Sequence, residues 1–189
     1  MVLALFHFED LDEVTRRWML EEFRAEWSQN PYKSPRLSQP GLAAFSELME
    51  AAILSGNEVT LSMALSNRTY WKRSEPFERR GRTYDRDINP VKAAQSLAIT
   101  EFNTWCVRGL SRRLMEEGEG MCEVYRADST WQPRAECVRH DGARYEVRAI
   151  YNGHRARYWP LPGNPGALSI PVGTNCHHTI RRIGRALGR

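Results

Sequence analysis

The stretch that decides the fold is 89–127, NPVKAAQSLAITEFNTWCVRGLSRRLMEEGEGMCEVYRA. Asn89 is suited to cap a helix and Pro90 to its first turn, whereas Gly118 and Gly120 are typical of a helix end. Between these signals apolar residues recur at steps of three and four, which predicts one long helix with an apolar stripe. The stripe comprises Ala94, Leu97, Ala98, Phe102, Trp105, Leu110 and Leu114. The expected polar face comprises Lys92, Gln95, Thr100, Asn103, Arg112 and Arg113.

The residues before this helix predict an N-terminal arm and a helical region, 1–66. VLALFHF at the start is typical of an extended arm. Asp10 or Asp12 can cap the first helix, and Asp10 is favoured because Glu13 completes a capping box. Helices are expected from there to about Trp27, from near Pro40 to Gly56, and from about Glu58 to Leu65.

The segment 67–88 has high charge and little periodicity, which predicts a long loop or an arm. Aromatic residues interleave with its basic residues, as in proteins that bind single-stranded nucleic acid. The first thirty residues are acidic, so the basic middle of one copy could meet the acidic end of another or lie against DNA; a solvated loop is the alternative. With the tail, the expected contact residues are Arg68, Lys72, Arg73, Arg79, Arg80, Arg82, Arg86, Arg181, Arg182 and Arg185.

Beyond Met121 the chain changes to short alternating apolar runs, which are typical of strands. The runs are CEVYRA, ECVRH, RYEVRAIY, RARYWPL and ALSIPV. Turn signals at Asp141-Gly142, Asn152-Gly153 and Pro162-Gly163 separate them. The expected fold class is α+β: N-terminal helices and a long central helix, followed by a small C-terminal antiparallel sheet. Residues 89–180 hold the helix and the sheet, and 181–189 form a basic tail.

Composition restricts the class of protein. With 189 residues, 41% of them hydrophobic, the chain can bury a core without disulfide bonds. The net charge of +4 is mild for a nucleic-acid binder. The apolar start lacks a basic flank and is too short for a signal or a membrane span, so we expect no membrane partner. Four irregularly spaced cysteines then indicate a cytosolic protein with reduced thiols.

Zinc is the cofactor that the residues would permit. Cys137 and His140 are spaced C-x-x-H, and Cys176 precedes His177 and His178. Two thiolates and two imidazoles from these positions could surround zinc tetrahedrally, and the candidate ligands are Cys137, His140, Cys176 and either His177 or His178. Buried thiols and surface histidines explain the same residues without a metal.

Enzymatic motifs are incomplete. Tyr125-Arg126 on a strand is similar to the dinucleotide-binding pair of some ADP-ribosyl-transferring enzymes, but Ser129-Thr130 follows too soon and no acidic residue follows Glu146. A cysteine nucleophile lacks an orienting third group. No phosphate loop or dinucleotide fingerprint is present. The sequence therefore predicts no enzyme.

Several segments resemble a family of uncharacterised proteins encoded among the structural genes of tailed actinobacterial phages. The similar residues are the opening HFEDLDEVTRRWMLEE, Ala93, Leu97, Ala98, Glu101-Phe102-Asn103, Val107-Arg108-Gly109-Leu110, Val124-Tyr125-Arg126-Ala127, Pro133-Arg134-Ala135-Glu136 and Asn164-Pro165-Gly166. Together they span about half of the chain. Between Cys137 and Trp159 the family is more helical than the strand pattern of this chain predicts.

The resemblance implies a virion protein of a tailed bacteriophage, located in the head or at the head-to-tail junction. Its expected partners are copies of itself, portal, capsid or neck proteins, and the backbone of packaged DNA. Assembly would take place in the host cytoplasm. The resemblance supplies no enzyme motif. Two further hypotheses stay open from the residues: a DNA-binding accessory protein of phage packaging and a zinc-containing module.

Overall fold

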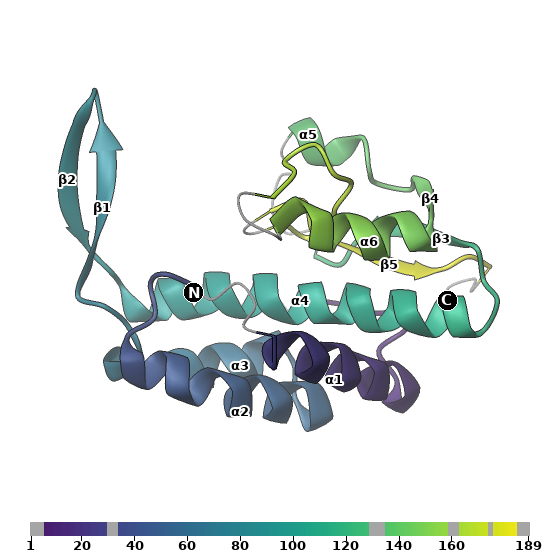
Figure 1. Cartoon of the computed structure of the whole chain (residues 1–189), viewed down its shortest axis with the longest axis horizontal. Coiled ribbons are helices and arrows are strands. Elements are labelled where there is room, and N and C mark those ends of the chain that lie inside the picture. The colour runs from purple at the N-terminus through teal and green to yellow at the C-terminus, as the bar shows by residue number, and fades with distance from the viewer. Residues whose placement is uncertain (1–5, 30–33, 129–134, 159–162, 174–175, 185–189) are drawn as a thin grey trace.

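The computed structural model describes residues 6–29, 34–128, 135–158, 163–173 and 176–184. Its central element is α4, Pro90–Glu116, a helix of 27 residues with other elements packed on two sides (Figure 1). One side is covered by α1 (Glu13–Trp27), α2 (Gln39–Ser55) and α3 (Glu58–Leu65). The other side carries a three-stranded sheet and α6 (Val147–Tyr158). The predicted α+β class, with N-terminal helices and a long central helix, is confirmed.

Helix ends follow local side-chain chemistry. Asn89 caps α4 by accepting a hydrogen bond from the backbone N–H of Lys92 at 3.0 Å, as its sequence position predicts. The cap of α1 is Asp12, which accepts from the backbone N–H groups of Val14 and Thr15. The preference for Asp10 as this cap was wrong. Asp10 is buried, and its carboxylate instead accepts from the backbone N–H of Arg182, 2.9 Å away.

The middle of α4 is buried on all sides, from Phe102 to Ser111. The prediction of a polar face was therefore wrong at Asn103, which is fully buried. The physical reason is that α4 packs against a hydrophobic core on each of two sides. Facing α1 to α3, one core includes Phe23, Phe45, Phe102 and Trp105; facing the sheet, another includes Leu110, Leu114, Val124, Ile150 and Ile180. A helix covered on both sides loses the one-sided stripe of a surface helix.

The C-terminal antiparallel sheet exists, but it is smaller than predicted. It consists of β3 (Met121–Arg126), β4 (Arg144–Glu146) and β5 (His178–Arg182), in the order β4-β3-β5. β5 takes its last two residues from the segment that the sequence assigned to a basic tail. ALSIPV was predicted to be a strand and is irregular.

Two further strand predictions were wrong, because ECVRH and RYEVRAIY contribute to helices. α5 spans Ala135–Val138, and α6 covers most of 144–158 after the three residues of β4. Val147 and Ile150 are both buried against α4 and the sheet. Their three-residue spacing places them on one face of a helix, and this packing overrides the strand propensity of the run.

The predicted hairpin turn at Asn152-Gly153 was wrong, because both residues lie inside α6. A Cβ atom on Gly153 would lie 1.8 Å from the carbonyl oxygen of Leu168, so the glycine permits close backbone packing. Gly142, with φ of +72°, does lie in a turn, which connects α5 to β4.

Most of the charged segment 67–88 is an ordered hairpin. A short 3-10 helix, η1 (Arg68–Tyr70), precedes β1 (Ser74–Arg79) and β2 (Arg82–Asp87), which pair antiparallel. Arg80 and Gly81 form the two-residue turn with φ of 52° and 73°, the backbone twist that favours tight hairpins. This hairpin projects from the end of α4, away from the remainder of the molecule (Figure 1).

The N-terminal arm, in its described part, packs on its own chain. The backbone N–H of His7 donates to Ala127 at 2.9 Å, and that of Phe6 donates to the buried carboxylate of Glu58 at 2.7 Å. Phe6 packs against Tyr125. Residues 6–8 are therefore not available to clasp a neighbour. In the described parts of the chain, no helix has the length and apolarity that crossing a bilayer would require.

Candidate functional sites

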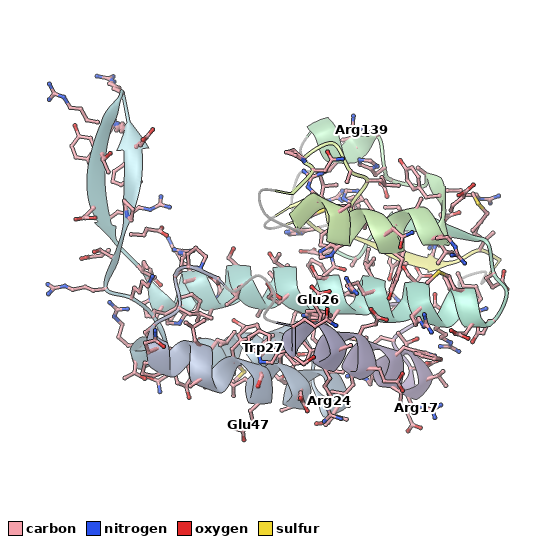
Figure 2. All side chains as sticks on the ribbon, viewed as in Figure 1. Arg17, Arg24, Glu26, Trp27, Glu47 and Arg139 are labelled. Carbon is pink, nitrogen blue, oxygen red and sulfur yellow. The ribbon has the colours of Figure 1, made fainter. Side chains whose placement is uncertain are left out.

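Of the helices and strands that the structure describes, the hairpin formed by β1 and β2 is the most exposed. All six residues of β2 are exposed, and Figure 2 shows the side chains of both strands with no other element beside them. A two-stranded hairpin alone is marginally stable in water, and its outer edges leave backbone groups unpaired. The element is therefore suited to contact another molecule.

The basic residues expected to make contacts in this region differ in whether they already have partners in their own chain. Arg68 is used internally, since its guanidinium donates to the carbonyl of Lys72 at 2.9 Å. Arg79, Arg80 and Arg82 lie at the exposed hairpin tip, where no carboxylate of the described residues pairs with them. Lys72 and Arg73 are exposed at the base of the hairpin, and Arg86 forms an ion pair with Glu75 at 2.7 Å.

Two of the arginines expected in a basic tail, Arg181 and Arg182, have partners within the chain. Arg181 binds Glu9 at 2.7 Å and also Glu123, and Arg182 pairs with Glu117. Arg185 lies outside the described residues. The acidic N-terminal end is engaged in the same way, because Asp12 binds Arg113 at 2.7 Å. Glu9, Asp12, Glu22 and Glu26 thus have partners within the chain, which leaves fewer carboxylates of the acidic end for a contact with the basic middle of another copy.

Three of the predicted metal ligands lie together in the C-terminal part. Cys137 of α5, Cys176 and His178 of β5 are buried, and their ligand atoms lie within 4.8 Å of one another. Burial lowers the pKa of His178, which favours the neutral imidazole that a metal requires. The Nε2 atom of His178 is buried without a hydrogen-bond partner. This is a Cys-Cys-His cluster of the kind that binds soft or borderline cations.

The other two candidate histidines have different partners. His140 Nδ1 lies 2.8 Å from the hydroxyl of Tyr145, and its Nε2 accepts from Arg139 at 3.2 Å. His177 lies 3.2 Å from the carboxylate of Asp128. His178 is therefore the imidazole that joins the two thiols, and His140, three residues after Cys137, is not part of the cluster.

Sequence reasoning missed a buried charge cluster around Arg108 of α4. Its side chain has 0% exposure and binds Glu22 and Glu26 of α1, the latter at 2.9 Å. Tyr151 of α6 donates to Glu22 at 2.8 Å and lies under the guanidinium, 5.2 Å away. Figure 2 shows Glu26 where α1 faces α4. A buried charge needs such partners, so the cluster links α1, α4 and α6.

Asn103 and Tyr125, which lie in the segments that resemble the phage family, form hydrogen bonds between elements of the fold. Asn103 donates from its side-chain amide to the carbonyl of His178 at 2.8 Å, which ties α4 to β5. Tyr125 donates to the carbonyl of His7 and accepts from the N–H of Glu9. Because its hydroxyl holds the N-terminal arm, Tyr125 is not arranged as part of a dinucleotide site.

No protein-family model matches the chain, and comparisons with curated proteins and with solved structures also found no match. Its function has to be inferred from its own residues and their geometry.

Proposed function

We propose that this chain is a structural virion protein of a tailed bacteriophage that acts in a symmetric head or head-to-tail connector assembly. The observation that carries the proposal is the projecting β1–β2 hairpin. The hairpin buries little surface against its own chain and presents arginines without carboxylate partners at its tip. Contact with a neighbouring molecule would bury this surface and pair these charges. Its partners are copies of itself and portal, capsid or neck proteins, and its location is the virion after assembly in the host cytoplasm.

The resemblance to phage structural proteins supports the same proposal. α6 brings the region between Cys137 and Trp159 closer to the helical character of that family. The similar residues Asn103, Arg108 and Tyr125 hold elements together inside the chain, as a shared framework requires. The proposal includes no catalytic role.

The test is assembly of the purified chain, alone and with the portal and capsid proteins of the same phage. Light scattering and negative-stain electron microscopy should detect a closed oligomer or a bound layer on the particle. A chain that stays monomeric and binds neither portal nor capsid protein would contradict the proposal.

DNA binding is a second candidate function, favoured by the unpaired arginines at 79, 80 and 82. Contacts to phosphates release counterions, so affinity for a DNA duplex should fall steeply between 50 and 200 mM salt. An assembly held by apolar and mixed contacts should be much less sensitive to salt.

We also propose that the Cys137, Cys176 and His178 cluster holds one zinc ion. Such an ion would connect α5 to β5, which are separated in the sequence by β4 and α6, in a lobe with a small core, where a structural metal is effective. Structural zinc takes four ligands, and His140 is the candidate for the fourth if it exchanges its present partners for the metal.

Elemental analysis of the purified chain tests this second proposal. We expect one zinc per chain, lost in Cys137→Ala and in Cys176→Ala. Cys122→Ala is the matched control, because Cys122 is also buried but contacts the carbonyl of Tyr145. A chain without stoichiometric metal, or with a Cys137–Cys176 disulfide after purification under argon, would contradict zinc binding.

A further inference from the structure

The hairpin has two chemically different faces. Residues directly opposite each other in antiparallel strands share a face, and successive pairs alternate between the faces. One face carries the pairs Glu75 with Arg86, Phe77 with Tyr84, and Arg79 with Arg82. The other carries Ser74 with Asp87, Pro76 with Asp85, and Glu78 with Thr83. We call them the arginine face and the acidic face.

The arginine face is aromatic at its centre and positive at its tip. The rings of Phe77 and Tyr84 lie 5.7 Å apart, and the guanidinium of Arg86 lies 5.6 Å from the Phe77 ring. Tyr84 is 46% exposed, and among the described residues this face contacts the body of the molecule through the ion pair of Glu75 with Arg36 at the base. Arg79 stands directly opposite Arg82, and like charges in that position destabilise an isolated hairpin.

The acidic face carries Glu78, Asp85 and Asp87 without a basic side chain among its paired residues. All three are exposed, and in the described part of the chain no arginine or lysine forms an ion pair with them. Pro76, also exposed, lies at the centre of this face. On the arginine face Arg86 already pairs with Glu75, whereas Arg79 and Arg82 at the tip have no carboxylate partner among the described residues. The acidic face could supply that partner, and the arginine face could supply the cations that the acidic face lacks.

We infer that the hairpin stacks, face to face, on the hairpin of a second copy of this chain, with the arginine face of one against the acidic face of the next. This inference rests on the proposed assembly and names its contact. With both hairpins pointing in the same direction, three levels match. Arg79 and Arg82 meet Glu78 at the tips, Phe77 and Tyr84 meet Pro76 at the centre, and Arg86 meets Asp87 at the base.

This stack would repeat from copy to copy and would form a ring if the rotation between neighbours closes. Two ribbons pack face to face at about 10 Å, which leaves room for both sets of side chains. The contact joins unlike faces, so it is heterologous and repeats from one copy to the next. Because every hairpin points the same way, the axis of such a ring would run parallel to the hairpins. Nucleic acid complements the arginine face alone, since its phosphates would repel Glu78, Asp85 and Asp87.

Charge reversal on each face tests the stack. Arg79→Glu with Arg82→Glu makes both faces acidic, and Glu78→Arg with Asp85→Arg makes both basic. Each variant alone should self-associate at least tenfold more weakly than the unchanged chain in sedimentation velocity, whereas the two variants should bind each other. A chain with all four substitutions should recover self-association, because its faces are complementary again.

The control is Arg17→Glu, on the outer side of α1 and away from the hairpin (Figure 2), which should leave association unchanged. Equal melting temperatures would establish that each variant is folded. If the unchanged chain assembles and the reversals do not weaken it, the stack is wrong while the proposed function stands. If the unchanged chain neither self-associates nor binds portal or capsid protein, the proposed function fails as well.

Nucleic acid gives a different result in the same set of variants. The arginine reversal would abolish binding to a DNA duplex, the acidic reversal would strengthen it, and mixing the two variants would restore nothing. That pattern, with self-association unaffected, would overturn the stack.

Discussion

Gly109 of α4 packs directly on the backbone of Met19 of α1, so close that a Cβ atom on the glycine would lie 2.5 Å from the Met19 nitrogen. This contact sets the distance between the two helices at the centre of the molecule. Arg108, the residue before Gly109, can therefore reach the carboxylates of Glu22 and Glu26 in α1.

Gly109→Ala should force α1 away from α4. The clash involves backbone atoms that cannot rotate aside, so we expect a loss of about 1–3 kcal/mol in the free energy of unfolding, measured by urea denaturation. Gly120→Ala is the matched control, because its Cβ atom would have no neighbour within 4 Å and its φ is not positive. Equal stability of the two variants would contradict a tight helix contact at Gly109.

Arg108→Met should destabilise the fold by about 3–5 kcal/mol, since it leaves the carboxylates of Glu22 and Glu26 without their buried partner. Arg112→Met is the control: Arg112 is 41% exposed in its side chain, and its pair with Glu116 should contribute less than about 1 kcal/mol. Urea denaturation of both variants checks this. A small effect at Arg108 would mean that the cluster does not hold the layers together.

His154 and Glu101, which lie near this cluster, should make the stability of the fold depend on pH in opposite directions. Burial, with Arg108 and Arg157 nearby, lowers the pKa of His154 to about 3, so acidification below its ordinary value of 6.5 protonates the unfolded chain first and destabilises the fold. Burial and Glu26 raise the pKa of Glu101 to about 7. Its contribution is greatest below pH 4.5 and is lost as the pH rises through about 7.

The two variants His154→Gln and Glu101→Gln separate these effects. From pH 6.5 to 5.0, His154→Gln should lose less stability than the unchanged chain, and Glu101→Gln should lose more. Each difference can reach roughly 1.4 kcal/mol per pH unit, the limit for one proton. Parallel pH profiles for all three chains would show that neither group titrates differently on folding.

The sequence predicted the elements whose signals are local. Asn89 and Pro90 at the start of α4, Gly118 after it, the end of α1 at Trp27 and the bounds of α3 all follow from capping and periodicity, whereas the preferred cap of α1 was wrong. α6 was missed because its residues alternate as a strand does, and only packing on α4 selects the helix. The prediction of a long loop or an arm for 67–88 missed the two strands, because their polar residues lack an apolar alternation and Arg80-Gly81 is not a typical turn pair.

Some residues of the candidate sites could be suggested from the sequence, whereas the roles of others depend on distant partners. Residue type and spacing were enough to suggest Cys137, Cys176 and His178, which the fold brings together. Sequence could not place Arg108, because a charged residue in a helix is usually exposed and its burial depends on α1 and α6. The roles of Arg181 and Arg182 also depend on distant partners, Glu9 and Glu117.

Removal of the hairpin should leave the rest of the fold intact. Ser74 and Asp87 are paired at its base, so Asn-Gly can replace residues 75–86 and connect them in a short turn. Among the described residues outside the hairpin, Arg36 would lose its ion pair with Glu75, which contributes at most about 1 kcal/mol to stability. We expect a melting temperature within about 4 °C of the full chain.

Assembly of this shortened chain, compared with that of the full chain by light scattering and electron microscopy, tests the central claim most directly. The account predicts that the full chain forms a closed oligomer, alone or on the portal, and that the folded, shortened chain does not. A shortened chain that assembles as well as the full one would contradict it.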